Sequence, residues 1–186
     1  MAHNKHSRNL IKLIRRFFIP GNSFWGAEIG VWKGHNAAML LEAFPSLLLY
    51  CVDPWDAGGD HVSMPDVDPE MFAAAKAEFL RLTDRYHDRR HVLPFTSNEA
   101  SRVVKDDARL TFVFIDGDHT YESVWRDLHL WYPKLRNGGL MSGHDYNWKD
   151  AETGDLVVRQ AVDEFARDHG YKVGVVPGQV WWFLKK

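Results

Sequence analysis

The sequence is poor in cysteine: Cys51 is the only one in 186 residues, so no disulfide can form within the chain. A chain without disulfides suits a reducing compartment, and we expect a cytoplasmic protein. No apolar run approaches the roughly 20 residues that a membrane-spanning helix needs. The segment from Met1 to Arg16 carries Lys, His and Arg throughout, so we expect no signal peptide.

An excess of charge of either sign is also missing. The chain has 23 Lys and Arg against 25 Asp and Glu, a net charge of -2. Binding to nucleic acid or to a membrane surface through bulk charge requires a strongly basic protein. We therefore expect neither partner. Hydrophobic residues make up 45% of the chain, which is ordinary for a globular protein, and the length suits one domain with one substantial core.

The most informative stretch covers residues 24–34, FWGAEIGVWKG. Residues 24–29 predict a buried strand, Gly30 begins a loop, and Gly34 precedes a helical pattern. A strand, a glycine loop and a helix N-terminus form a cradle for nucleotide-like ligands. Glycine permits a sharp turn at Gly30 and a close approach to a ligand or helix at Gly34. The spacing differs from the Gly-x-Gly-x-x-Gly of dinucleotide binders, which disfavours a nicotinamide oxidoreductase.

Glu28, near the end of that strand, is costly to bury without a partner, and a cationic or amine ligand would supply one. Together with Gly30 and Gly34 it resembles motif I of the class I S-adenosylmethionine-dependent methyltransferases. In that family Glu/Asp-x-Gly-x-x-x-Gly holds the methionine end of the cofactor. The alternative is a tight strand-to-helix turn with a solvated Glu.

Asp53 follows a second continuous apolar run, residues 47–52. An acid at the tip of this strand accepts hydrogen bonds from both ribose hydroxyls in proteins that bind nucleotides. The alternative is an Asp that merely starts a turn before Pro54. Trp55 could cover an adenine ring or belong to the core. The polar loop at residues 56–68 is long enough to be functional.

Apolar runs and amphipathic patterns alternate along the rest of the chain. They predict a doubly wound, Rossmann-like α/β fold, with a mostly parallel seven-stranded sheet and a C-terminal antiparallel hairpin. We expect strands at 24–29, 47–52, 92–95, 110–115, 140–143, 171–176 and 179–184, and helices at 10–18, 36–44, 69–82, 97 onward, 121–135 and 157–165. The expected helix caps are Asn36, Asp68 and Ser97, and the expected helix stops are Pro20-Gly21 and Asn137-Gly138-Gly139.

We divide the chain into an N-terminal helical extension, residues 1–22, and one domain, residues 23–186. The first nine residues are expected to lack regular structure. The sequence does not define the role of the extension, and it leaves a homo-oligomer open.

Polar side chains stand at the carboxyl end of each predicted parallel strand, where ligands bind in a doubly wound sheet. Packing alone does not explain this convergence. Asp116, His144 and Asp145 are a chemically sensible ligand set for one divalent cation, since oxygen donors suit Mg²⁺ and the imidazole admits Mn²⁺, Fe²⁺ or Zn²⁺. The alternative for His144 is a helper that orients Asp145. The residues at the strand ends are Glu28, Gly30, Asp53, Ser97, Asp116, His119, His144 and Asp145.

His119 lies three residues after Asp116, just beyond a strand end, and can face the same cleft. A histidine there can act as a general base near neutral pH. The alternative is a residue that only caps the following helix.

Two segments, FVFIDGDHTY at residues 112–121 and LRNGGLMSGHDY at 135–146, carry a more specific resemblance. They resemble the small class I methyltransferases related to macrocin- and mycinamicin-type sugar O-methyltransferases and to the cephalosporin-biosynthetic enzymes. The resemblance covers nearly all of residues 24–184. It implies that Asp116 is a metal ligand, that His119 is catalytic, and that Asp145 is the second member of an acid pair whose first member, usually Glu, is His144 here.

The catechol-type relatives add a second implication. Their residues equivalent to Ser97 and Asn98 contact adenine, although a plain helix cap is an equal alternative here. They also carry Asn where this chain has Tyr146, which leaves the identity of any metal open.

The sequence thus predicts an S-adenosylmethionine-dependent O-methyltransferase that acts on a hydroxyl of a small molecule such as a sugar or polyol. A divalent metal, Mg²⁺ or Mn²⁺, would assist. The rival hypothesis is a non-catalytic small-molecule or cofactor-binding domain of the same fold. We expect the loops at 56–68 and 145–155 to define the acceptor.

Overall fold

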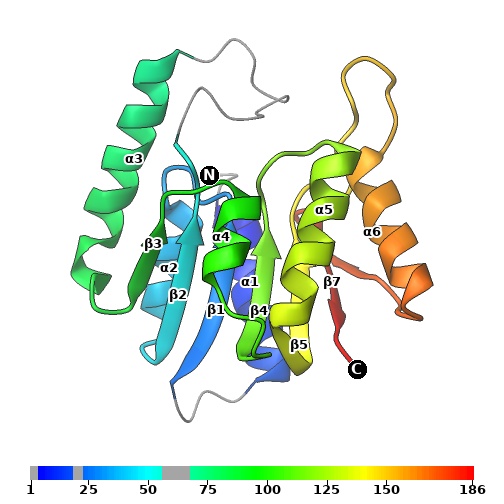
Figure 1. The fold of residues 1–186 in the computed structure, drawn as a ribbon, viewed down its shortest axis with the longest axis horizontal. Coiled ribbons are helices and arrows are strands. Elements are labelled where there is room, and N and C mark those ends of the chain that lie inside the picture. Colours follow the sequence, from blue (N-terminus) through cyan, green and yellow to red (C-terminus); the bar gives the residue numbers. More distant parts are fainter. Residues whose placement is uncertain (1–3, 19–22, 56–67) are drawn as a thin grey trace.

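The computed structural model describes residues 4–18, 23–55 and 68–186. Its centre is a seven-stranded sheet in the order β3-β2-β1-β4-β5-β7-β6 (Figure 1). Neighbouring strands among β1 to β5 pair in parallel, and β7 is antiparallel to both β5 and β6. This confirms the predicted fold. The strands are β1 (Phe24–Ile29), β2 (Leu47–Val52), β3 (Arg90–Leu93), β4 (Leu110–Ile115), β5 (Leu135–Gly143), β6 (Gly174–Val176) and β7 (Val180–Leu184).

Helices cover both faces of the sheet. In the view of Figure 1, α4, α5 and α6 lie in front of the strands, and α1 and α2 lie behind them. Each layer has its own apolar core, one shared by α1, α2 and α3 and the other by α4, α5 and α6. The helices are α1 (Asn4–Phe17), α2 (His35–Ala43), α3 (Pro69–Thr83), α4 (Ser97–Val103), α5 (Tyr121–Trp131) and α6 (Val157–Asp168), with short 3₁₀ turns at Asp84–Tyr86 and Tyr132–Lys134.

The central strand β4 shows why a continuous apolar run marks a parallel strand. All six of its residues are buried. Phe112 and Phe114 face the core under α1 and α2, while Val113 and Ile115 face the core under α5 and α6. Alternate side chains of a strand point to opposite faces, so a strand covered on both sides must be apolar throughout.

Two of the three predicted helix caps are wrong. The correct one is Asp68, whose side chain accepts a hydrogen bond from Glu70 N at 2.9 Å. Helix α2 begins at His35, with Gly34 at its N-cap in a left-handed conformation, so Asn36 lies inside the helix. Helix α4 is capped by Thr96 rather than Ser97, because Thr96 and Glu99 form a reciprocal capping box.

Two further corrections concern element ends. The chain is already helical at Asn4, so residues 4–9 do not lack regular structure. The segment 137–139, predicted to end a helix, lies inside β5 instead, because α5 ends at Trp131. The domain boundary at residue 22 stays a prediction, although α1 packs into the core that it shares with α2. The stop at Pro20-Gly21 and the loop at 56–67 lie outside the described residues.

Candidate active site

The glycine loop between β1 and α2 lies where the strand order reverses, between β1 and β4. Gly30 and Gly34 have φ angles of 87° and 76°, which favour glycine. A Cβ on Gly30 would lie 2.3 Å from the Asp116 carbonyl oxygen, and one on Gly34 would lie 2.5 Å from the Phe79 ring. Both glycines are therefore required by the packing of the chain itself, which shapes an open backbone cradle at the usual ligand position of this fold.

Asp53 closes this loop. Its Oδ2 accepts a hydrogen bond from Trp32 N at 2.8 Å, and its Oδ1 accepts one from Trp55 N at 2.9 Å. The Trp55 indole donates to the Trp32 carbonyl at 2.9 Å and packs against Phe79. Trp55 is buried in the core, as one of its two alternatives predicted. Asp53 holds the cradle in shape whether or not its carboxylate also meets a ribose.

Glu28 lies beneath the cradle and is only 1% exposed. Within the described residues its Oε2 has no hydrogen-bond partner, and neither do the side-chain amide atoms of Asn36. Burial raises the pKa of Glu28 well above its usual value. The Asn36 amide opposes this shift, and the Asp116 and Asp53 carboxylates reinforce it. Burial thus favours the uncharged form of this carboxyl, which suits support of the loop better than a charged contact to an amine.

Asn36, predicted as a helix cap, is instead a buried polar residue beside the cradle. Its position just after the glycine loop was the only available signal.

The second half of the candidate site gathers the predicted metal ligands. Asp116, His144 and Asp145 each offer one ligand atom, and these three atoms lie within 4.8 Å of one another. His144 Nδ1 is 3.4 Å from Asp116 Oδ1 and 3.0 Å from Asp145 Oδ2. His119 Nε2 is 2.8 Å from the same Asp145 oxygen. The donors are close enough to hold one divalent cation, so the residues fit the predicted metal.

These four side chains strongly perturb one another. Burial opposes the charged form of His144, but the carboxylates of Asp116 and Asp145 outweigh it and raise the His144 pKa to about 10. Burial is likewise outweighed at His119, mainly by Asp145, so its pKa is raised. The two histidines hold the pKa of Asp145 well below its usual range, against the effect of burial. The imidazolium of His144 thus already supplies a positive charge between the two carboxylates.

Two aromatic side chains border this cluster and were not predicted. The Trp148 indole stacks on His119, with ring centroids 4.8 Å apart, and remains 43% exposed. The His6 ring of α1 lies 4.6 Å from the ring of His144. No local pattern could reveal His6, because its contact joins distant parts of the sequence. A small pocket adjoins the cluster, lined by Ile115, Asp116, Gly117, Asp118, His119, Val124, His144, Val158 and Trp181.

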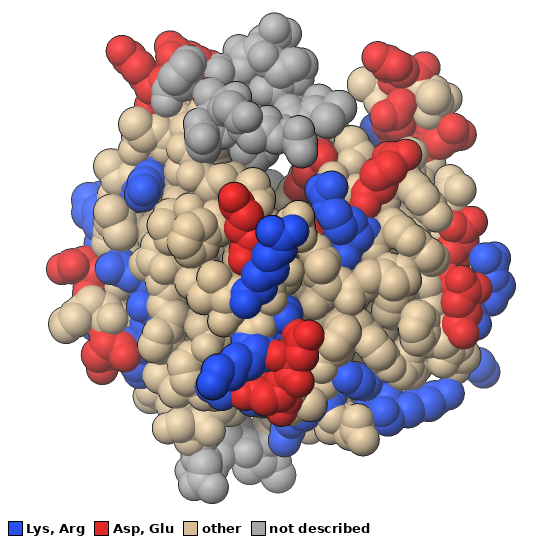
Figure 2. All heavy atoms as spheres, in the orientation of Figure 1, with Lys and Arg blue, Asp and Glu red and all other residues tan. Residues whose placement is uncertain are grey.

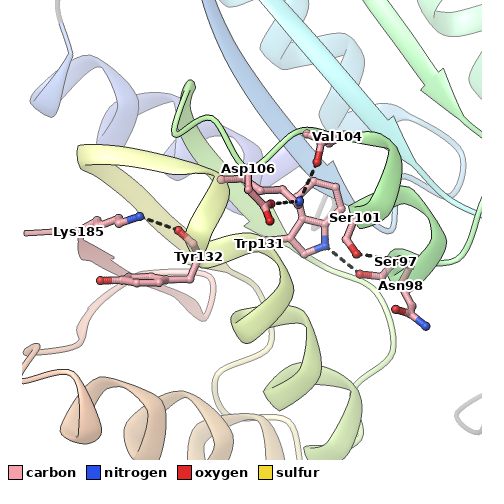
Figure 3. Close-up of polar contacts among 9 residues, drawn as sticks. Ser97, Asn98, Ser101, Val104, Asp106, Trp131, Tyr132 and Lys185 are labelled. Atoms are coloured by element: carbon pink, nitrogen blue, oxygen red, sulfur yellow. Dashed lines mark hydrogen bonds and ion pairs between the residues drawn. The ribbon is translucent and has the colours of Figure 1, made fainter.

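Ser97 uses its hydroxyl within the protein (Figure 3). It donates to Asp127 and accepts a hydrogen bond from the Trp131 indole at 2.9 Å, so it ties α4 to α5. The Asn98 carbonyl accepts a hydrogen bond from Ser101 at 2.7 Å, and the Asn98 side chain is exposed. A role of Ser97 and Asn98 at adenine stays a prediction.

The fold and the cradle define the class I methyltransferase architecture, and a comparison with known families agrees. Residues 27–146 match a family described as a methyltransferase domain. This match spans well over half of the chain, so the chain belongs to that family and is an S-adenosylmethionine-dependent methyltransferase. The resemblance to class I methyltransferases is confirmed, and the family favours an enzyme over a non-catalytic binding domain.

Solved structures share the fold at low sequence identity. A putative caffeoyl-CoA O-methyltransferase from Staphylococcus aureus is 15% identical, with a TM-score of 0.70 over 97% of this chain and 83% of its own. The O-methyltransferase NovP is 19% identical, with a TM-score of 0.65 over 100% and 80%. An O-methyltransferase from Bacillus cereus in complex with SAH is 13% identical, with a TM-score of 0.66 over 97% and 80%. No curated protein matches the sequence.

Proposed function

We propose that the protein transfers the methyl group of S-adenosylmethionine to a hydroxyl of a small molecule that carries a ring, such as a sugar or a phenol. The observation that carries this proposal is the cluster of His119, Asp145, His144 and Asp116 at the carboxyl ends of β4 and β5. Two carboxylates and two imidazoles can bind a hydroxyl and accept its proton. The solved structures with this fold include named O-methyltransferases.

The cofactor lies, on this proposal, along the cradle between β1 and α2. The turn at Gly30 and Gly34 receives the methionine end, above the buried Glu28. The carboxylate of Asp53 stands at the tip of β2, where acids of this fold meet the ribose, and Ser97 and Asn98 lie at the start of α4, on the adenine side. The proposal is supported by the backbone shape of the cradle, which the hydrogen bonds to Asp53 fix in advance.

His119 serves as the base. Its Nε2 faces Asp145 at 2.8 Å, and a carboxylate in that position orients the ring and stabilises the imidazolium that forms when a proton arrives. The carboxylate of Asp145 raises the pKa of His119, so the neutral form that accepts a proton is favoured when Asp145 is engaged elsewhere. Asp145 also faces His144, and this second partner offers such a competing contact.

Asp116, His144 and Asp145 would hold a divalent metal, with Mg²⁺ or Mn²⁺ the best match to two carboxylates and one imidazole. A metal there supplies Lewis acidity that lowers the pKa of an adjacent hydroxyl. His144 must be neutral to act as a ligand, so its raised pKa makes metal loading compete with protons.

Trp148 forms the wall on which the acceptor ring rests. Its turn is fixed from two sides: Trp148 N donates to the Asp145 carbonyl at 2.7 Å, and Asn147 N donates to the Gln179 side chain at 3.1 Å. A rigid and exposed indole beside His119 presents a flat surface to a sugar or aromatic ring, because tryptophan buries large area at low entropic cost.

The decisive experiment is a transfer assay with radiolabelled S-adenosylmethionine, with and without Mg²⁺ or Mn²⁺. The panels contain sugars, polyols and catechols, with amines and carbon nucleophiles for comparison. We expect product with at least one ring-bearing hydroxyl compound, and slower turnover of that compound by the Trp148→Ala enzyme. Calorimetry with S-adenosylhomocysteine runs in parallel. Cofactor binding combined with transfer to nitrogen or carbon acceptors alone would contradict the choice of oxygen.

A further inference from the structure

The exposed side of helix α1 carries one kind of charge only. Among residues 5–17 of this helix, the exposed side chains are all Lys or Arg, and α1 contains no Asp or Glu. None of these five cations has an ion-pair partner among the described residues. We call this surface the α1 basic face. It consists of Lys5, Arg8, Lys12, Arg15 and Arg16.

The net charge of the chain conceals this asymmetry. Of the 23 Lys and Arg, 18 lie outside α1 with all 25 Asp and Glu, so the rest of the chain carries -7 while α1 carries +5. Elsewhere the surface is mixed: Figure 2 shows blue and red side chains interspersed across the face formed by α4, α5 and α6. Helix α6, for instance, sets Arg159 and Arg167 beside Asp163, Glu164 and Asp168. The α1 basic face therefore departs from the solvated, charge-balanced surface of the other helices.

The opposite side of α1 is fixed in the domain. Leu10 and Ile14 are fully buried, and the Asn9 side chain donates a hydrogen bond to the Pro177 carbonyl in the turn between β6 and β7. The helix cannot turn its apolar side outward without unfolding that core. A partner thus meets a rigid row of cations about 16 Å long, from the helical rise of 1.5 Å per residue.

We propose that the α1 basic face binds the surface of an anionic lipid membrane. The buried centre of a protein interface is typically apolar or aromatic, and proteins that read nucleic-acid bases add polar or aromatic side chains for them. The exposed part of α1 offers neither. A plane of anionic headgroups needs only charge, and clusters of four to eight Lys or Arg on a helix are typical of such binding. The expectation of no membrane partner rested on the net charge, which averages over this face.

This placement adjoins the candidate active site. His6, in the first turn of α1, has its ring 4.6 Å from that of His144. Binding through α1 would hold the enzyme with that end of the site beside the lipid surface, so acceptors that partition into the membrane would reach it first. The binding itself requires no methyl transfer, so it can hold or fail independently of the proposed activity.

The test is co-sedimentation of the full chain with vesicles of phosphatidylcholine containing about one third phosphatidylglycerol. We expect binding at low salt, none to pure phosphatidylcholine, and release near 1 M salt, where the screening length is about 3 Å. A triple variant, Lys5→Gln, Arg8→Gln and Lys12→Gln, should bind roughly a hundredfold more weakly, at about fivefold per cation. Glutamine preserves the helix propensity, and circular dichroism verifies the fold.

The matched control removes three exposed cations from other elements: Arg81→Gln, Arg102→Gln and Lys172→Gln. It changes the net charge equally and should retain wild-type vesicle binding. Three results would each overturn the proposal: no binding of the wild type at low salt, an equal loss in the control, or stronger binding to double-stranded DNA or to poly-glutamate than to the vesicles. An equal loss in the control would mean that the binding depends only on bulk charge. Stronger binding to DNA would assign the face to nucleic acid, and stronger binding to poly-glutamate would assign it to an acidic protein partner.

Discussion

The two halves of the sheet edge use their acidic groups in opposite ways. In the β1–β2 half, both oxygens of Asp53 accept backbone N–H groups, and Glu28 is buried with a raised pKa. In the β4–β5 half, the side chain of Asp145 contacts two imidazole rings, those of His119 and His144. In the first half, the Asp53 carboxylate is already held by backbone hydrogen bonds. In the second half, the charged side chains contact one another, and a substrate or metal can rearrange them. Mutations in the first half should therefore change the stability of the fold and the affinity for the cofactor, and mutations in the second half should change turnover and metal binding.

The largest expected effect tests the second half. His119→Ala should lower turnover by about 10²–10⁴-fold, which is the usual contribution of a general base. Binding of S-adenosylhomocysteine should stay at the wild-type level, because the partners of His119 among the described residues, Asp145 and Trp148, belong to the β4–β5 half of the site. Single-turnover kinetics with an identified acceptor, together with calorimetry, measure both quantities.

Trp148→Phe is the matched control for His119→Ala, because it keeps an aromatic ring on the imidazole. It should raise KM more than it lowers kcat. Full activity in the His119→Ala enzyme would leave proton removal to His144 or to a metal, and would reduce His119 to a structural neighbour of Trp148.

The next effect tests the first half. Asp53→Ala removes the acceptor for Trp32 N and Trp55 N, and hydrogen bonds to a charged group contribute about 1.5–3 kcal/mol each. We expect a lower melting temperature without ligand, and an affinity for S-adenosylhomocysteine that is lower by roughly tenfold or more. Thermal unfolding and calorimetry separate the two consequences.

Asp150 offers a matched control for Asp53, since its carboxylate also accepts two backbone N–H groups, from Glu152 and Thr153, but in an exposed loop. Asp150→Ala should leave cofactor affinity unchanged. If Asp53→Ala lowers the melting temperature and retains wild-type cofactor affinity, then Asp53 supports the loop and does not reach the ribose.

This contrast between the halves also explains which features of the fold could be predicted. Continuous apolar runs such as β4 specify buried parallel strands by composition alone, and the glycines at 30 and 34 mark the cradle. The extent of β5 could not be predicted, because Asn137-Gly138-Gly139 is locally a helix stop. Its place in the strand depends on pairing with β4 and on the hydrogen bonds of Gly138 and Gly139 to Lys185.

In the candidate site, too, local sequence specifies some features and tertiary packing decides the others. Asp116, His144 and Asp145 could be predicted to meet, since parallel strands end at one edge of the sheet. Their charge states could not, because the positive charge of His144 depends on distances of 3.0 and 3.4 Å to the two carboxylates. His6 was missed because its contact to His144 follows from how α1 packs on the sheet, which no local pattern encodes.

A smaller effect is expected for the proposed metal ligands. Asp145→Asn removes a charged ligand and should weaken Mn²⁺ binding about tenfold or more, since even indirect partners of a metal contribute tenfold. Cofactor affinity should remain, because Asp145 lies in the other half. Isothermal titration with Mn²⁺ measures the metal affinity. The control is Asp163→Asn, because Asp163 accepts a hydrogen bond from the Tyr146 hydroxyl and is not in the proposed ligand set. Unchanged Mn²⁺ binding in Asp145→Asn would remove this residue from the ligand set.

The last prediction concerns Asp127, a buried acid of α5 that lies outside both halves. Burial raises its pKa to about 7, although the hydrogen bond from Ser97 and the nearby Arg126 oppose the shift. The folded state therefore keeps a proton that the unfolded chain releases above its ordinary pKa of 3.8. Stability should fall as the pH rises from about 4 to about 7, by at most about 1.4 kcal/mol per pH unit, and level off above that.

Asp127→Asn keeps the shape and an acceptor for Ser97 but cannot ionise. Urea unfolding between pH 5 and pH 8 should show the variant gaining on the wild type as the pH rises, with the difference constant at the alkaline end. Ser97→Ala removes a hydrogen bond that favours the ionised form, so it should raise the Asp127 pKa further and extend the decline in stability to higher pH than in the wild type. A difference that does not change with pH would mean that Asp127 is ionised throughout, held by Ser97 and Arg126 strongly enough to overcome its burial.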